Sequence, residues 1–469
     1  MARVTHIAPT LLDNRQHALI ASIIGLCISV WATNSMVSVT VLPSAVVEIG
    51  GVALLSWATT IYITASIVVS ASAGWMRARI GLRRGIALGV ITFAAGSALC
   101  ALAPTMPVLL GGRLLQGAGS GLAAALCYIL VRTYFPQALW PRIFAMIAAV
   151  WGVAALAGPA LGGLLTQLVD WRFAYLAMLV PAALLLIMTL AVLPRDADAG
   201  RGAALPIGRL SLLAAGILSI GLAANLAGVA SAALAVAAGI GLVVLAAALD
   251  QRSAEPIFPR AAFSFSSPVG LGLTAKCSMI VSTMPVSIYG AYILQTVHGA
   301  TPLIAGYLVA LEALAWTAAA NIVPRLPHRA TGAAILAGPL LAGGGMALGA
   351  VTLSTGPLPM AGLAIAIMGS GFGICWAFLS GHVMAGAEPG EEDRTASAIP
   401  TAETAGIALG AALTGVAGNA FGIAEARTPA EMAATVPPLM AVFIAAAIVA
   451  LAAAFRIVRR RRPVVAAAG

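Results

Sequence analysis

The sequence has 469 residues, of which 61% are hydrophobic and only 9% are charged. A water-soluble domain carries about 25% charged residues, so this composition excludes the ordinary soluble classes and indicates a membrane protein with many spans. The formal charge of +10 does not indicate nucleic-acid binding, because the arginines are scattered singly along the chain and are not gathered on one soluble face.

Runs of about 20 apolar residues, the length that crosses the hydrocarbon core, recur along the whole chain. We expect an all-helical polytopic fold with fourteen spans, at 18–43, 53–76, 85–103, 107–133, 141–167, 171–193, 208–228, 231–249, 268–293, 302–323, 329–353, 358–384, 394–422 and 435–457. The seventh and eighth spans can also be read as one long tilted helix. The GVAS turn near Gly228 and the total length favour two helices.

The arginines predict the orientation of the chain. With both termini in the cytoplasm, the 25 basic residues fall in the tails and cytoplasmic loops, except Arg113 and Lys276 within spans and Arg172 and Arg427 outside. This is a strong positive-inside bias. We interpret the terminal run RIVRRRRP as a stop-transfer anchor near anionic lipid. The sequence therefore predicts a multi-pass protein of a bacterial inner membrane, with both termini cytoplasmic.

A glycine pattern repeats within the chain. QGAGSG at 116–121 and MGSGFG at 368–373 align glycine on glycine, and such internal symmetry is typical of transporters. We pair the first six spans with the last six and treat the seventh and eighth as an inserted hairpin. The predicted parts are an N-terminal six-helix bundle, a linker with the inserted hairpin, a C-terminal six-helix bundle and a basic cytoplasmic tail, at 1–193, 194–267, 268–457 and 458–469.

Nothing in the sequence requires a cofactor or a metal. The five cysteines fall in apolar runs, without the paired spacing of a metal site or a disulfide framework. The chain lacks the glycine-rich Lys-Ser/Thr loop that binds nucleotide phosphates. His298, His328 and His382 fall near loops or helix ends, so we expect no catalytic constellation within the spans and no enzyme.

Four stretches resemble motifs of the major facilitator superfamily, and specifically of its fourteen-helix drug:proton antiporter branch. GWMRARIGLRR from Gly74 is similar to the basic loop between the second and third helices, and RLLQGAGSG from Arg113 to the helix 4 motif. GVAALAGPALGG at 152–163 resembles the helix 5 motif of antiporters, and WRFAYLAMLVPA from Trp171 the start of the sixth helix. The resemblance implies a secondary transporter that works by alternating access and exports drug-like compounds in exchange for protons.

The basic loop is implied to act as a latch that holds the cytoplasmic side closed. We expect a tight turn that carries Gly74, Arg77, Arg79, Gly81, Arg83 and Arg84. The acidic residue that the family has in this loop falls at Ala78 here, so the latch lacks its negative member. The arginines also fit a simpler role as topology markers.

The helix 5 motif brings small residues together. Gly158 and Gly162 lie one turn apart, which lets a neighbouring backbone approach closely, and Gly163 extends the set. Pro159 removes a backbone donor and can bend the helix. A bent, closely packed helix suits a rocking motion between two halves, although simple small-residue packing is the alternative.

Arg113 is the unusual residue of the helix 4 motif, which also contains Gln116. An arginine at a helix centre costs about 2.5–3.5 kcal/mol on insertion scales. One alternative is snorkelling toward the outer surface, which lies roughly two turns away. We favour a position at a wet central cavity, where the guanidinium holds a substrate oxygen or responds to the protonation of a nearby acid.

The acid that the antiporter branch has on its first helix appears as Asn34 here, and an amide cannot titrate. The acids well inside spans are Glu312 and Glu403, and Lys276 is the chain's one lysine. Lys276 and Glu403 lie at similar depth, so we expect them to pair as a gate or a structural pair. Glu312, near mid-membrane, is our candidate for the titrating coupler.

Aromatic residues give a hint about the substrate. Trp31, Trp151, Trp316 and Trp376 fall within spans, where a planar organic substrate can stack on them or where they simply pack. The missing acid at Asn34 leaves open an alternative function, uptake of a planar metabolite or vitamin such as riboflavin. In either case we expect a monomer in lipid, with a small organic substrate and protons as its partners.

Overall fold

The structure is a computed structural model that describes residues 14–51, 54–195, 205–223, 226, 228–325, 330–423 and 425–460. These residues form helices and connecting turns, with no strand among them. The chain divides into two compact units, which we name the N-terminal unit (Met1–Leu205) and the C-terminal unit (Pro206–Gly469). His328 and the basic tail beyond Arg460 lie outside the described residues.

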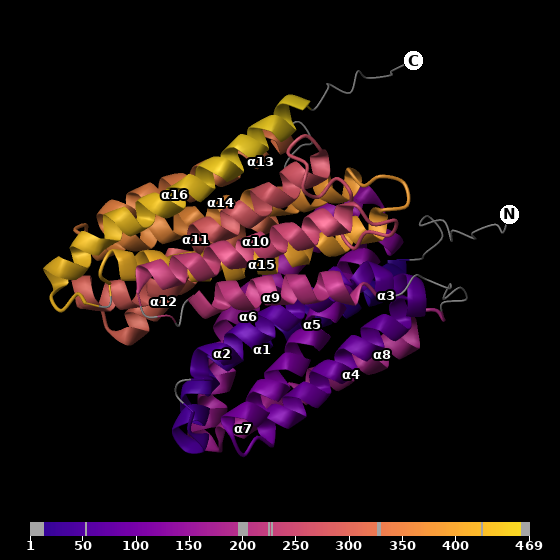
Figure 1. The fold of residues 1–469 in the computed structure, drawn as a ribbon, viewed down its shortest axis with the longest axis horizontal. Coiled ribbons are helices and arrows are strands. Elements are labelled where there is room, and N and C mark those ends of the chain that lie inside the picture. The colour runs from indigo at the N-terminus through magenta and orange to yellow at the C-terminus, as the bar shows by residue number, and fades with distance from the viewer. Residues whose placement is uncertain are drawn as a thin grey trace. The chain divides into compact units, whose positions relative to one another are not determined.

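The helices of the two units are labelled in Figure 1. The N-terminal unit contains α1 (Asn14–Ile49), α2 (Leu55–Ala71), α3 (Ala73–Ile80), α4 (Leu82–Ala101), α5 (Met106–Tyr134), η3 (Gln137–Leu139), α6 (Trp140–Leu168), α7 (Trp171–Ala177) and α8 (Leu179–Val192). The C-terminal unit contains α9 (Ile207–Ala223), α10 (Val229–Gln251), α11 (Pro268–His298), α12 (Pro302–Ile322), η4 (Val323–Arg325), α13 (Thr331–Thr352), α14 (Leu358–Ala385), α15 (Glu392–Ala420) and α16 (Pro429–Arg460).

The all-helical, multi-pass character that the composition predicts is confirmed. In the described part of the chain, 11 helical segments are long and apolar enough to cross a membrane. The apolar helices Trp57–Ala71 and Ile207–Ala223 are shorter, and the more polar α15 is not among the 11. Each predicted span contains a helix, but the total of fourteen membrane crossings stays a prediction.

Local sequence explains where several helices begin. Proline occupies the first turn of α5, α6, α11, α12 and α14, where its missing N–H costs no helical hydrogen bond. Side chains also cap the first turns of α11, α12 and α7: Ser267 and Thr301 each accept from the backbone N–H three residues on, and Asp170 accepts from the Arg172 N–H.

The expected tight turn at 74–84 is wrong in its extent. Residues 73–80 form helix α3, so Gly74 and Arg79 lie on a helix, and Arg83 and Arg84 lie in the first turn of α4. The turn is confined to Gly81, whose φ of 84° and ψ of 173° suit glycine and few other residues. A single glycine separates α3 from α4, and the residues on both sides of it complete helical turns.

The repeated glycines make the same helix contacts in each unit. In the N-terminal unit, a Cβ at Gly117 or Gly121 would overlap backbone oxygens of α2, whereas one at Gly119 would overlap α4. In the C-terminal unit, Gly369 and Gly373 face α12 in the same way, and the glycine between them faces α13. The shared motif therefore seats its helix between two close neighbours in both units.

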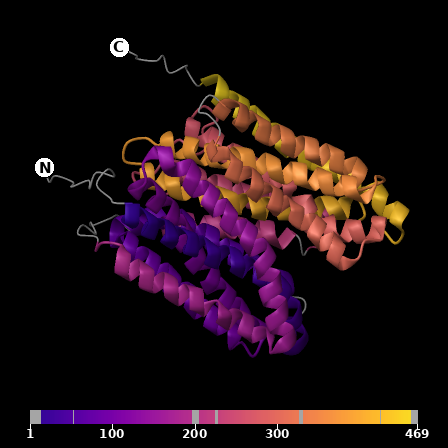
Figure 2. The same ribbon diagram turned by 180° about the vertical axis from the view of Figure 1, so that it is seen from behind.

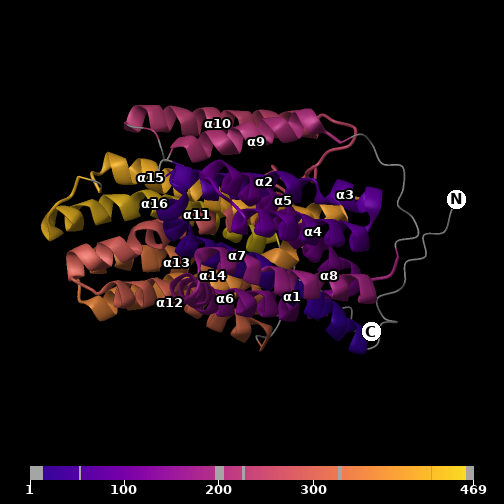
Figure 3. The same ribbon diagram turned by 90° about the horizontal axis from the view of Figure 1, so that it is seen from below.

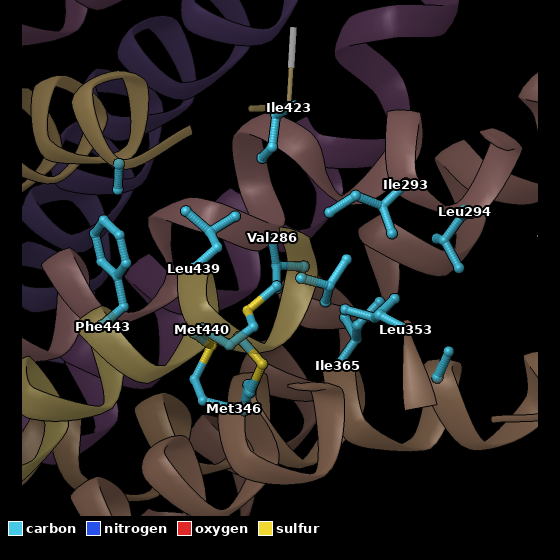
Figure 4. Close-up of a cluster of buried hydrophobic side chains, with 14 of the residues drawn as sticks. Val286, Ile293, Leu294, Met346, Leu353, Ile365, Ile423, Leu439, Met440 and Phe443 are labelled. Atoms are coloured by element: carbon cyan, nitrogen blue, oxygen red, sulfur yellow. The ribbon is translucent and has the colours of Figure 1, made fainter. Parts of the chain in front are cut away.

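Large apolar side chains fill the centre of the C-terminal unit, between α11, α13, α14 and α16. Figure 4 shows this cluster, which includes Val286, Ile293, Leu294, Met346, Leu353, Ile365, Ile423, Leu439, Met440 and Phe443. α16 packs along α11 and α13, and its yellow ribbon lies beside the orange α13 in Figures 1 and 2. This core holds α11 and α14, the helices that carry Lys276 and Trp376, in fixed register.

The α9–α10 hairpin, seen side by side in Figure 3, belongs to the C-terminal unit. Its residues Ile220 and Val236 pack with Ala412 of α15. At the base of the hairpin, Arg209 pairs with Asp250, which is 1% exposed and also accepts from two backbone N–H groups of the following loop. The hairpin is thus held by apolar packing against α15 and by the Arg209–Asp250 ion pair at its base. Its assignment to a separate linker stays a prediction.

Candidate functional site

The Arg113 side chain is 2% exposed and reaches into the N-terminal unit. Its Nε donates to the Ala58 carbonyl of α2 at 3.2 Å, and its Nη1 donates to Ser38 Oγ of α1 and to Gln116 Oε1, each at 2.9 Å. The guanidinium also lies over the Tyr62 ring, 4.2 Å from the centroid. A snorkelling arginine would be exposed, whereas Arg113 is buried and makes three hydrogen bonds through Nε and Nη1.

The partners of Arg113 are all neutral, and they determine the orientation of the next groups. An arginine can only donate, so Gln116 presents its Oε1 to it and turns its Nε2 toward Asn34 Oδ1, at 3.1 Å, and Ser97 Oγ, at 2.9 Å. The Asn34 Nδ2, on a side chain with 0% exposure, is then left without a partner among the described residues. The network therefore links α1, α4 and α5 without any titratable carboxyl group.

A second polar cluster lies in the C-terminal unit, around Lys276. Its Nζ lies 2.8 Å from Glu403 Oε1 and donates to Ser380 Oγ at 2.6 Å. It also sits 4.6 Å from the centroid of the Trp376 ring, and the Trp376 Nε1 donates to the same Glu403 oxygen at 2.7 Å. The structure thus brings together the lysine and the acid that were expected to pair, and adds Trp376 and Ser380 to them.

Glu312 has a different environment from Glu403. It is half-buried on α12, accepts a hydrogen bond from Ser287 Oγ at 3.3 Å, and has no cationic partner within the described ranges. Of the two intramembrane acids, one is therefore neutralised by a buried cation and the other is not. An unpaired carboxyl group can gain or lose a proton without breaking an ion pair, which is the property expected of a coupling residue.

The four tryptophans within spans form two edge-to-face pairs, one in each unit. Trp31 and Trp151 have ring centroids 5.1 Å apart, and Trp316 and Trp376 have centroids 5.9 Å apart. The second pair continues to Phe372, whose centroid is 5.4 Å from that of Trp316. The C-terminal pair thus joins the Lys276 cluster.

The helix 5 motif divides into residues that pack and residues that do not. A Cβ at Gly158 would overlap Met36 of α1, and one at Gly162 would overlap Thr40. Gly163 has open space where its side chain would be. α6 continues through Pro159, whose side chain lies outside the described residues. The close approach that the one-turn spacing predicts is therefore made to α1.

The arginines of the basic motif contact their own unit. Arg83 Nη2 donates to the Leu190 carbonyl of α8 at 2.6 Å, and Arg79 lies 6.0 Å from the Trp75 ring centroid. Arg84 is exposed. Their role as a latch stays a prediction.

The sequence analysis missed an ion-pair cluster at one end of the N-terminal unit. Glu48, at the end of α1, pairs with Arg172 at 2.7 Å and accepts from the Trp171 Nε1 at 2.7 Å. Arg172 also pairs with Asp170, at 3.5 Å, and stacks on Trp171 at 4.3 Å. The helix 6 motif contains Trp171 and Arg172 and directly follows Asp170, but nothing in it points to Glu48, 124 positions before Arg172.

This cluster predicts a pH-dependent stability. The hydrogen bond from Arg172, and next that from Trp171, hold the pKa of Glu48 below its ordinary value. A carboxyl group with a lowered pKa stabilises the fold above its unfolded pKa, about 4.3, and loses that contribution as the pH falls below it. We expect Glu48→Gln to lower the unfolding temperature slightly at pH 7 and by less at pH 3.5, because the contribution disappears as the pH falls through the lowered pKa of Glu48. Thermal unfolding at the two pH values tests this, with exposed Glu425→Gln as the control; an equal decrease at both would contradict it.

The family model and the relatives found by comparison with known proteins agree on one family. The sequence model of the Major Facilitator Superfamily matches residues 23–411. A protein of Mycobacterium tuberculosis described as a "Probable multidrug-efflux transporter" is 34% identical over 408 residues, which cover 84% of this chain and 86% of the relative. A "Multidrug resistance protein B homolog" of the same species is 28% identical over 385 residues, 78% of this chain and 69% of the relative.

Solved structures share the fold at low identity. The human organic anion transporter MFSD10 has a TM-score of 0.67 and 15% identity, covering 95% of this chain and 100% of its own. The proton:xylose symporter XylE has a TM-score of 0.67 and 14% identity, covering 93% of this chain and 95% of its own.

The multidrug relatives give no support to the alternative of riboflavin uptake, and we do not propose it.

Proposed function

Because the chain belongs to the Major Facilitator Superfamily, and is therefore a transporter of small molecules rather than an enzyme, we propose that it exports drug-like organic compounds in exchange for protons. The observation that carries the proposal is its 34% identity, over 84% of the chain, to the protein described as a "Probable multidrug-efflux transporter". In this proposal the protein acts as a monomer in a bacterial inner membrane with both termini cytoplasmic.

Alternating access is the proposed mechanism, with the six-helix bundles at 1–193 and 268–457 as the two moving parts. The glycine motif supports this, because it gives each bundle a rigid, closely packed trio of helices. Gly158 and Gly162 supply a smooth contact between α6 and α1. Arg79, Gly81 and the neighbouring arginines are the proposed latch of the cytoplasmic side.

Proton coupling cannot use the position of Asn34 on the first helix, because an amide does not titrate. Glu312 is the proposed coupler: it is the intramembrane carboxyl group without a cationic partner among the described residues, and the hydroxyl group of the exposed Ser287 donates to it at 3.3 Å. Arg113 and Gln116 are proposed to bind substrate oxygens or to hold the N-terminal bundle in its conducting shape, since their donors are already oriented.

The prediction is that Glu312→Gln abolishes proton-driven export. Glutamine keeps the size and the hydrogen bond but cannot exchange a proton, so we expect the rate of export to fall at least about tenfold. The measurement is ethidium efflux and internal pH in sealed vesicles with an imposed pH gradient, at matched protein levels. Glu255→Gln, at an exposed position, is the control with the same chemical change.

Two outcomes separate the parts of this proposal. Undiminished export by Glu312→Gln across the same pH gradient would remove Glu312 from the coupling role. Failure of the wild-type protein to export any of a panel of cationic dyes and antibiotics would contradict the proposed function itself.

A further inference from the structure

We propose that Glu403 and Trp376 form a binding site for an organic cation, that Lys276 occupies this site as an internal substitute, and that the arriving cation makes Lys276 release a proton. The inference rests on the proposed function and deepens it, since it names the substrate class and a second place where a proton is exchanged. It is carried by the geometry around Lys276 in the C-terminal unit.

The site has the two features that recognise an ammonium group, a carboxylate and an aromatic face. The Lys276 Nζ lies 2.8 Å from Glu403 Oε1 and 4.6 Å from the centre of the Trp376 ring. The Trp376 Nε1 donates to that same oxygen, at 2.7 Å, and so holds the carboxylate beside the ring. Lys276 therefore makes the contacts that a bound organic cation would make.

The aromatic surface extends beyond what a lysine needs. Trp316 packs edge-to-face on Trp376, with an interplanar angle of 80°, and Phe372 packs edge-to-face on Trp316, at 89°. The three rings come from α12 and α14 and form a continuous aromatic wall. A lysine contacts one ring of it, whereas a cation with aromatic substituents can contact several.

Glu403 is the more accessible member of the pair. Its side chain is 11% exposed, whereas that of Lys276 is 1% exposed. A cation that enters the site therefore meets the carboxylate first. One carboxylate balances one cation, so the entering cation displaces the ammonium group, whose side chain is almost fully buried.

The surroundings offer Lys276 no replacement for Glu403. From α14, Ser380 and the Cys375 thiol face it, and both are neutral. α13 carries no ionisable residue, α12 contributes Glu312, which is bonded to Ser287, and the charged residues of α16 lie near its two ends. An uncompensated buried charge is costly, so the displaced group must become neutral.

The exchange conserves charge at the site. One N–H bond of the Lys276 ammonium breaks, its proton leaves to water, and the electron pair stays on Nζ as a neutral amine. The Glu403 carboxylate keeps its charge and pairs with the substrate cation. One proton leaves for each cation that binds, and protonation of Lys276 from the other side of the membrane expels the cation.

The test is proton release on binding, measured with the purified full-length protein in lipid nanodiscs. Tetraphenylphosphonium is the probe, because its charge is permanent and it has no proton to lose. Calorimetry at pH 7 in two buffers of different ionisation enthalpy should show one proton released per bound probe, and the affinity should rise about tenfold per pH unit. Uncharged triphenylphosphine oxide should release none. Absence of probe binding, or binding without proton release, would overturn the proposal.

Variants assign the proton to Lys276. Lys276→Arg keeps a cation that cannot deprotonate, so we expect at least tenfold weaker probe binding with no proton released. Lys276→Met should bind the probe with an affinity independent of pH. Glu403→Gln should lose probe binding, whereas Glu388→Gln, the same change at an exposed position, should bind as the wild type does. Proton release by Lys276→Arg equal to that of the wild type would assign the proton elsewhere and overturn the inference.

This failure differs from a failure of the proposed function. Proton-driven export by a protein whose probe binding releases no proton from Lys276 would leave the function standing and remove the inference. Cation binding with proton release, in a protein that exports nothing in vesicles, would do the reverse.

Discussion

Arg113→Met is expected to destabilise the N-terminal unit by about 2–3 kcal/mol and to abolish transport. The change removes three hydrogen bonds and leaves buried acceptors on Ala58, Ser38 and Gln116 without this donor. A buried acceptor that loses its partner costs about 1–3 kcal/mol. The sum stays at the low end, because Ser38 Oγ still donates to the Asn34 carbonyl and Gln116 Oε1 still accepts from the Cys100 thiol, and because removing a buried charge relieves part of its insertion cost.

The measurement is thermal unfolding of the detergent-purified variant together with dye efflux in vesicles. Arg113→Lys is the matched control: it keeps the charge but lacks the planar fork that reaches α1 and α2 at once, so an intermediate loss is expected. Arg113→Met with wild-type stability would contradict the buried network, and Arg113→Met with wild-type efflux would show that the network is structural only.

The second large effect is expected from Gly369→Ala. The added methyl group would overlap the backbone oxygen of Glu312, which cannot rotate away, so α12 and α14 must separate. Overpacking of this kind costs about 1–3 kcal/mol and occasionally more. Gly117→Ala should act equally in the N-terminal unit, where the overlap is with the Tyr62 oxygen.

Gly306→Ala on α12 is the control for Gly369→Ala, since nothing lies within 4 Å of its added Cβ. There alanine should leave the stability unchanged or raise it, because alanine is the better helix former by about 1 kcal/mol. Unfolding temperatures of the three variants, at equal expression, test the prediction. A Gly369→Ala protein as stable as the wild type would mean that the two helices are less closely packed than the structure shows.

The glycine motif illustrates how far a sequence pattern leads. The aligned glycines at 117 and 369 predict two related halves, and the structure shows that each motif packs its helix between two neighbours. Which helices those neighbours are depends on the path of the whole chain. Similarly, the tight turn expected at 74–84 shrinks to Gly81, because the residues around it complete helices instead.

The candidate site was predictable where one residue is chemically unusual in its surroundings. A single lysine, two acids and one arginine within apolar runs are conspicuous, because each is costly in lipid. Lys276 and Glu403 were predicted to pair from their depth alone, because both lie a similar number of residues from the cytoplasmic surface. No such count reveals Ser380 or Tyr62, whose types are ordinary in helices and whose importance comes from the side chain they face.

The sequence by itself determined the class of protein, the helical spans and the costly residues, because these follow from local composition, apolar run length and the price of a charge in lipid. Only the tertiary structure decided which of those residues meet. Arg113 is satisfied by neutral groups of α1, α2 and its own helix α5, Lys276 is held by an acid and an indole ring, and Glu312 has no cation beside it in the described part of the chain. The physical reason is that pairing depends on the rotation and register of helices far apart in sequence, which close packing of the whole bundle determines.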